Sequence, residues 1–255
     1  MRTIALSLVA FFACSAAWAD SPFDGTWQLN ATKSQLAGDT MSFDDAGGGT
    51  WKYTDSDQSY SFKPDGSSFT TPMGIERTFQ KTAEGYTTTN KKNGLLISSG
   101  FWKLSDDTNT LVIESKGTKP NGDTFDNLTT YVRTAPGTGL IGGWKSTKVK
   151  LSNPNSLTLQ SNGGEVTLTI SAIKATCHAN WDGKDYPATG PTVPDGITVA
   201  VSKSGPNSFK LVEKYKGKVL EIIHYHLAAD GKSMTAKGTN GEGKEPFTEV
   251  YDKQS

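Results

Sequence analysis

The sequence is poor in the residues that carry most catalytic and redox chemistry. Of its 255 residues only two are cysteine and three are histidine. Cys14 lies in the leader described below, so Cys177 alone remains and an internal disulfide is excluded. A lone thiol in an apolar strand is typical of a small buried side chain. We therefore expect this fold to be stable through its core alone.

An excess of one charge is also lacking, because 26 Lys and Arg residues balance 26 Asp and Glu residues. This neutral balance provides no basic face, so we expect no nucleic-acid partner. After the leader, no apolar run has the length needed to span a bilayer, and no transmembrane segment is expected. The sequence contains no Gly-x-Ser-x-Gly nucleophile motif and no phosphate-binding glycine loop, and it indicates no cofactor.

The N-terminus has the features of a secretory signal peptide. Arg2 supplies a positive charge, residues 4–13 are apolar, and Ala17-Trp18-Ala19 is a small-x-small cleavage motif. We predict cleavage after Ala19 and a secreted or periplasmic location. The alternative is a lipoprotein acylated on Cys14, but Phe11-Phe12-Ala13 differs from the Leu-small-small run that such a site requires.

An internal repeat fills the rest of the chain. Its clearest pairs of segments are Gly25-Thr26-Trp27 with Gly142-Gly143-Trp144, Lys116-Gly117-Thr118 with Lys237-Gly238-Thr239, and Tyr131-Val132-Arg133 with Tyr251-Asp252-Lys253. Between the copies lies a stretch whose Pro and Gly content is typical of a linker. We predict two domains, residues 20–134 and 142–255, joined by a linker at 135–141.

Each half reads as a series of short strands and tight turns. Runs rich in β-branched and aromatic residues are separated by turn motifs such as Pro64-Asp65-Gly66, Asn93-Gly94 and Asp230-Gly231. No segment shows a sustained helical stripe of apolar residues. About eight such strands per half predict an all-β protein made of two tandem antiparallel up-and-down β-barrels, each closing its own sheet.

The ends of each half resemble the first and last strands of the calycins, which include lipocalins and fatty-acid-binding proteins. The resemblance rests on the opening Gly-x-Trp and on the cation that follows the closing Tyr by two residues. In calycins this cation lies across the Trp ring at the base of the barrel. The resemblance therefore implies the pairs Trp27–Arg133 and Trp144–Lys253, each worth ~0.5–2 kcal/mol.

The chain departs from this family in two respects. The segment 31–46 is too short and too rich in Gly and Asp for the helix pair of fatty-acid-binding proteins. The Arg that holds a fatty-acid carboxylate in that family is replaced here by Thr129 and Glu249. A carboxylate clamp of the usual kind is therefore absent, and a ligand need not be a fatty acid.

Aromatic residues beyond those at the barrel bases suggest a binding pocket. Our candidate ligand-binding residues are Trp51, Tyr53, Trp102, Trp181, Tyr186 and Tyr225. Large aromatic side chains with polar tips line many small-molecule sites, and they predict an apolar or amphipathic ligand. The alternative for each of these residues is a place in a well-filled core.

The motif His224-Tyr225-His226 is the one candidate for metal binding or catalysis. Residues two apart on a strand share a face, so both imidazoles could reach one metal ion together with His178. The matching positions in the first half are Phe101 and Lys103, so we expect no metal site here.

Two other classes of function remain open at this stage. One is a hydrolase or isomerase on the same scaffold that uses His224, Tyr225 or His226 as acid or base. The other is a structural or protein-binding pair of filled β-domains.

Overall fold

The computed structural model describes residues 21–240 and 245–254. The predicted leader, with Cys14 and the cleavage site after Ala19, lies outside the described residues. Regular structure in the described part is β-strand apart from one short 3₁₀ turn, Ser171–Ile173. The predicted all-β class is therefore confirmed. Among the described residues no helix has the length and apolarity needed to cross a membrane.

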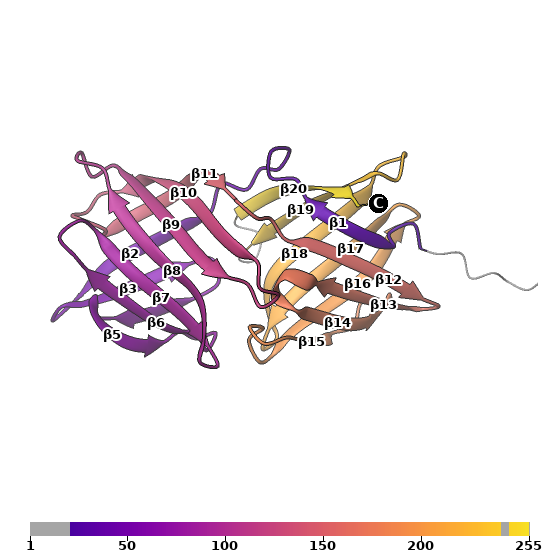
Figure 1. Ribbon diagram of the computed structural model, residues 1–255, viewed down its shortest axis with the longest axis horizontal. Coiled ribbons are helices and arrows are strands. Elements are labelled where there is room, and N and C mark those ends of the chain that lie inside the picture. Colours follow the sequence, from indigo (N-terminus) through magenta and orange to yellow (C-terminus); the bar gives the residue numbers. More distant parts are fainter. Residues whose placement is uncertain (1–20, 241–244, 255) are drawn as a thin grey trace, which may run out of the picture.

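The strands form two antiparallel sheets of ten strands each, which lie side by side in Figure 1. The first sheet, here called the first barrel, has the order β4-β3-β2-β11-β10-β9-β8-β7-β6-β5, so β4 and β5 are its edges. Its strands are β2 (Thr40–Gly47), β3 (Thr50–Asp55), β4 (Ser59–Phe62), β5 (Asp65–Thr70), β6 (Glu76–Lys81), β7 (Tyr86–Lys92), β8 (Leu95–Leu104), β9 (Thr110–Thr118), β10 (Thr124–Ala135) and β11 (Gly142–Lys150).

The second sheet closes on itself and is here called the second barrel. Its strands are β1 (Gly25–Leu29), β12 (Ser156–Asn162), β13 (Glu165–Ile170), β14 (Ala175–Asn180), β15 (Tyr186–Thr189), β16 (Ile197–Gly205), β17 (Ser208–Tyr215), β18 (Lys218–Leu227), β19 (Ser233–Asn240) and β20 (Glu245–Lys253). The predicted fold of two antiparallel barrels is confirmed, with ten strands per sheet in place of about eight.

The two halves of the sequence exchange their first strands. Strand β1 pairs with β12 and β20, and in Figure 1 its indigo arrow lies beside the yellow β20 of the second barrel. Strand β11 pairs in turn with β10 and β2 of the first barrel. The expectation that each half closes its own sheet is therefore wrong. The boundaries 20–134 and 142–255 delimit the sequence repeat, whereas the sheets divide the chain differently.

A hairpin accounts for this arrangement. The segment that we interpreted as a linker, 135–141, is short enough to turn β10 directly back onto β11, and strands adjacent in sequence commonly pair. Strand β11 then completes the first barrel, which is continuous in sequence from Thr40 to Lys150. The first barrel is thus inserted between the first two strands of the second barrel.

The tryptophan–cation pairs at the barrel bases exist, but with exchanged partners. The Arg133 guanidinium lies 4.2 Å from the Trp144 ring centroid, and the Lys253 ammonium lies 5.1 Å from that of Trp27. The predicted pairs Trp27–Arg133 and Trp144–Lys253 are wrong, because each Trp belongs to the other half's barrel. Both indoles are fully buried.

The glycine of each Gly-x-Trp motif lies directly under the cation. Gly25 and Gly142 have φ values of 133° and 118°, where side chains are strained. A Cβ atom would lie 2.7 Å from Lys253 Cε at Gly25 and 2.9 Å from Arg133 Nη1 at Gly142. Glycine at these positions therefore allows the cation to cover the Trp ring.

The repeat is preserved in strand register as well as in strand order. The pair Tyr53 and Tyr60 of the first barrel corresponds to Leu168 and Cys177 of the second, because both pairs are direct partners at the same place in the sheet. A register shift follows Asn90 in the first barrel and Glu213 in the second. Each position of one barrel can therefore be compared with its equivalent in the other.

Candidate ligand-binding cavity in the second barrel

The second barrel contains a cavity of about 470 Å³. This volume lies within the range of small-molecule sites. Aliphatic and small side chains from strands β12 to β16 form one wall, and this wall includes Leu168, Ala188 and Val199. Asp57 and Met73 of the first barrel also line the cavity. The site is therefore built by the second barrel and completed by turns of the first.

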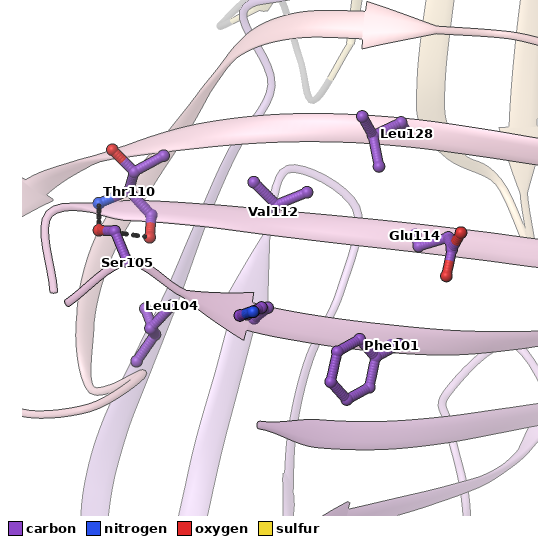
Figure 2. A pocket seen from close by; sticks show the side chains of 8 residues that line it. Phe101, Leu104, Ser105, Thr110, Val112, Glu114 and Leu128 are labelled. Atoms are coloured by element: carbon purple, nitrogen blue, oxygen red, sulfur yellow. Dashed lines mark hydrogen bonds between the residues drawn. The ribbon is translucent and has the colours of Figure 1, made fainter. Parts of the chain in front are cut away.

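Other hollows differ from this cavity in lining and position. One of about 390 Å³ lies against Phe101, Val112 and Leu128 on strands β8, β9 and β10 of the first barrel (Figure 2). Two larger hollows, of about 970 and 680 Å³, are lined mostly by polar and charged residues. None of these three is walled by the interior of the second barrel.

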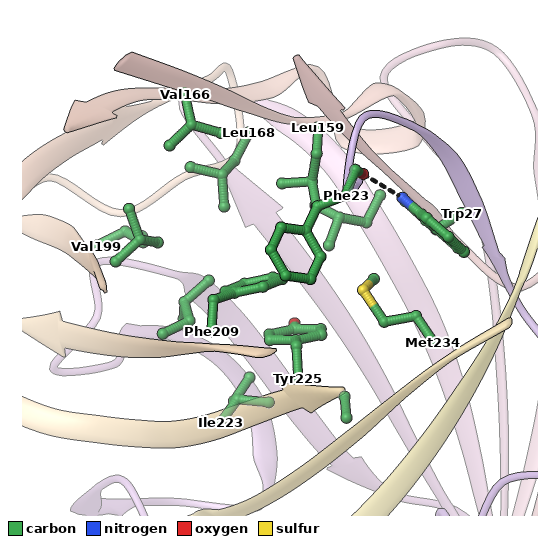
Figure 3. Packing of buried hydrophobic residues seen from close by; sticks show 14 of the residues in the cluster. Phe23, Trp27, Leu159, Val166, Leu168, Val199, Phe209, Ile223, Tyr225 and Met234 are labelled. Atoms are coloured by element: carbon green, nitrogen blue, oxygen red, sulfur yellow. Dashed lines mark hydrogen bonds between the residues drawn. The ribbon is translucent and has the colours of Figure 1, made fainter. Parts of the chain in front are cut away.

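Smaller residues replace aromatic ones at equivalent positions of the second barrel, and two of them, Leu168 and Cys177, line the cavity. In the first barrel, aromatic rings pack against one another and fill the interior. The second barrel carries Leu159 for Phe43, Val166 for Trp51, Leu168 for Tyr53, Cys177 for Tyr60 and Ala179 for Phe62. Figure 3 shows Leu159, Val166, Leu168 and Val199 around the interior of the second barrel.

Three glutamates line the opposite wall of the cavity. They are Glu213 on β17, Glu221 on β18 and Glu249 on β20. Glu213 and Glu221 are direct cross-strand partners, an arrangement that is destabilising for like charges. None of the ion pairs found among the described residues includes any of the three. In the part of the chain that the structure describes, no Lys, Arg or His lines the cavity.

Burial makes all three carboxyl groups weaker acids than an ordinary glutamate. Burial raises the pKa of Glu221 to about 8, and the charges of Glu213 and Glu249 add to the shift. Burial also raises the pKa of Glu213 and of Glu249. The Tyr251 hydroxyl donates a 2.6 Å hydrogen bond to Glu249. The glutamates thus carry a cost of ionisation that an external cation would reduce.

Tyr225 presents a polar group to the same cavity. Its ring is 5 % exposed and stacks on Phe209, with centroids 4.4 Å apart and planes 9° from parallel. Within the described part of the chain the Tyr225 hydroxyl makes no hydrogen bond, although the residue lines the cavity. Burial, with the three nearby carboxylates, raises the pKa of Tyr225 far above its ordinary value. It is therefore a neutral hydroxyl that has no hydrogen-bond partner among the described residues.

Of the six predicted ligand-binding residues, Tyr225 alone lines this cavity. Trp51, Tyr53 and Trp102 belong to the aromatic cluster that fills the first barrel. Trp181 packs against Phe209, with ring centroids 5.4 Å apart, next to the buried Phe23. The hydroxyl of Tyr186 accepts a 2.8 Å hydrogen bond from Asn180 and donates to Asp182.

The histidines of the His-x-His motif lie on the outer face of β18. His224 and His226 are exposed, whereas Tyr225 and Leu227 point inward, as strand alternation predicts. The imidazoles and the Tyr225 hydroxyl are therefore on opposite faces and cannot act in one site. Among the described residues no group of three His, Cys, Asp or Glu side chains is placed to hold a metal ion.

Cys177 is buried in the wall of the cavity, as expected for a small apolar side chain. Burial raises the pKa of its thiol to about 11, so it is not an activated nucleophile.

Sequence reasoning missed the three cavity glutamates. The signal was present, because each lies at an inward position of an alternating strand, as in Glu221-x-Ile223-x-Tyr225. A charged residue in such a position is unusual and indicates a buried polar site.

Comparison with models of known protein families finds no match to this sequence, and comparison with curated proteins finds none either.

Proposed function

We propose that this protein binds a small apolar or amphipathic molecule inside the second barrel. The observation that carries the proposal is the cavity of about 470 Å³ with its aliphatic wall. The resemblance to calycins supports the same reading, since many members hold such ligands within a barrel. The signal-like leader supports a secreted or periplasmic carrier.

The two barrels then have different roles. The first barrel has a structural role, because packed aromatic rings occupy the space that corresponds to the cavity of the second barrel. Its turns place Asp57 and Met73 at the wall of the cavity. The first barrel therefore supports and closes the site that the second barrel forms.

Fluorescence of N-phenyl-1-naphthylamine, an uncharged apolar probe, tests this function. Binding should raise its emission, and Ala188→Phe should abolish the rise because the added ring enters the cavity. Thr189→Phe is the matched control, because Thr189 is the next residue of β15 and points outward. Unchanged binding in Ala188→Phe would place the probe elsewhere and contradict the proposal.

An enzyme is the second candidate, and one observation favours it. Glu221, with a pKa of about 8, would be a protonated general acid at neutral pH. The cavity lacks an activated nucleophile, because burial raises the pKa of both Cys177 and Tyr225. Turnover of a bound compound that is lost in Glu221→Gln while binding persists would favour the enzyme.

A further inference from the structure

We propose that the ligand is an amphipathic cation, an apolar molecule with one basic nitrogen, bound through the Glu213–Glu221 pair, Glu249 and Tyr225. This inference rests on the proposed function and names the chemical class of its ligand. Among the described residues, four acidic ones, Asp57 included, line the cavity and no basic one does. The fold thus supplies the anions for an ion pair and leaves the cation to be provided by the ligand.

The first barrel shows that the fold does not require these carboxylates. Asn90 and Ser98 occupy the positions equivalent to Glu213 and Glu221, and they are likewise direct partners beside a register shift. Asn90 donates a 2.9 Å hydrogen bond to Ser98 and accepts one of 2.6 Å from Arg77. A neutral pair joined by a hydrogen bond therefore occupies this place in the first barrel. The second barrel has two glutamates here instead, and neither forms an ion pair with a described residue.

Tyr225 gives independent support for a polar ligand group. It is a nine-tenths buried side chain that lines the cavity, and its hydroxyl has no partner within the described part of the chain. In strand register Tyr225 and Glu249 flank Ala236, so the hydroxyl and a carboxylate lie along one row of the sheet. A ligand ammonium N–H can donate to the Glu249 carboxylate and to the Tyr225 oxygen, which accepts as well as donates.

The glutamate carboxylates are confined to one wall, which fixes how the ligand lies in the cavity. All three glutamates come from β17, β18 and β20, whereas the lining residues of β12 to β16 are uncharged. A molecule that places its nitrogen against the first wall lays its apolar part against the second. An anionic head group would meet repulsion, and a purely apolar ligand would leave the acids unpaired.

Calorimetric titration with three ten-carbon probes tests the inference. The probes are decylamine, which is protonated at pH 8.5, 1-decanol and decanoate, which share a chain and differ in head-group charge. At pH 8.5 and low salt we expect the cation to bind about tenfold or more tighter than the alcohol, as a charged contact implies. Decanoate should bind more weakly than the alcohol.

Variants separate the charge effect from the cavity itself. The double variant Glu213→Gln with Glu221→Gln should lose the preference for the cation and keep the affinity for 1-decanol, which also reports its folding. Glu165→Gln, at an exposed position of β13, should change neither. Equal affinities for the three probes would overturn the inference and leave the proposed function standing. Absence of binding by all three would overturn the proposed function as well.

Discussion

At the scale of single residues, the two tryptophan–cation pairs differ in strength. The Arg133 guanidinium donates hydrogen bonds of 2.9, 2.7 and 2.6 Å to the carbonyls of Thr108, Ile141 and Gly139 while covering Trp144. Lys253 is exposed and makes no such bonds within the described residues. We expect Arg133→Ala to lower the free energy of unfolding by ~2–4 kcal/mol, against ~0.5–1 kcal/mol for Lys253→Ala.

Urea denaturation followed by tryptophan fluorescence measures both losses. Arg133→Lys is the informative intermediate, since it keeps the charge but cannot reproduce the planar fork of donors. It should recover only part of the stability lost in Arg133→Ala. Equal effects of the two alanine substitutions would show that the carbonyl bonds add nothing.

The half-buried Glu221 makes stability depend on pH. Its pKa rises from an ordinary 4.5 to about 8 on folding. Between these values the folded protein holds the proton and the unfolded chain does not, so the free energy of unfolding falls as pH rises, by on the order of a few kcal/mol. Glu213 and Glu249, whose pKa values are also raised, act in the same direction.

We therefore expect Glu221→Gln to be more stable than the original protein at pH 9 and close to it at pH 4.5. Urea midpoints at several pH values in this range measure the difference. Glu165→Gln, which removes an exposed carboxylate of the same barrel, serves as the control. If the urea midpoint changed with pH equally in the original protein and in Glu221→Gln, groups other than Glu221 would cause the pH dependence.

At the scale of elements, sequence patterns predicted much of the fold but could not assign strands to barrels. Turn dipeptides and alternating residues located the strands, and Gly-x-Trp located the barrel bases. The partners of Trp27 and Trp144 were wrong, because the two halves are similar enough for either first strand to fit either barrel. The choice depends on the length of the 135–141 segment, which suits a hairpin as well as a linker.

Engineered disulfides can distinguish exchanged from unexchanged strands. Thr26 and Thr158 are direct partners with hydroxyl oxygens 3.0 Å apart, so Thr26→Cys with Thr158→Cys should form a bond on mild oxidation. In an unexchanged fold Thr26 would take the place of Gly143, whose partner is Ser42. The pair Thr26→Cys with Ser42→Cys is thus the matched control and should stay reduced. Both pairs are made in a protein that also carries Cys177→Ala. Mass spectrometry without a reductant then shows whether each pair has formed a disulfide.

At the scale of the whole molecule, the exchange links the two barrels into one structure. Tyr215 donates a 2.8 Å hydrogen bond to the carbonyl of Pro72, and Lys218 donates one of 3.2 Å to that of Asp57. These contacts bring turns of the first barrel to the cavity. The sequence predicted a pocket but placed it among the aromatic residues. The interior with fewer rings is the hollow one, since large side chains fill the space that a ligand needs.

The exchanged topology makes a direct prediction about fragments. Residues 38–152 contain all ten strands of the first barrel, including β11 with the fully buried Trp144. Residues 20–134, one copy of the sequence repeat, lack β11, which pairs with both β2 and β10. Arg133 also loses its contact with the Trp144 ring. Losing a buried tryptophan alone costs ~3–5 kcal/mol, a large share of the stability of a domain of this size.

We expect fragment 38–152 to unfold cooperatively in urea and to show the near-ultraviolet circular dichroism of a packed aromatic core. Fragment 20–134 should show neither, and its unpaired β1 together with the exposed edges of β2 and β10 should make it prone to aggregation. The two fragments have the same length and share residues 38–134. They differ in that fragment 20–134 begins with β1, whereas fragment 38–152 ends with β11. A cooperative transition in fragment 20–134, with none in 38–152, would show that each half closes on its own first strand and that the exchange does not occur.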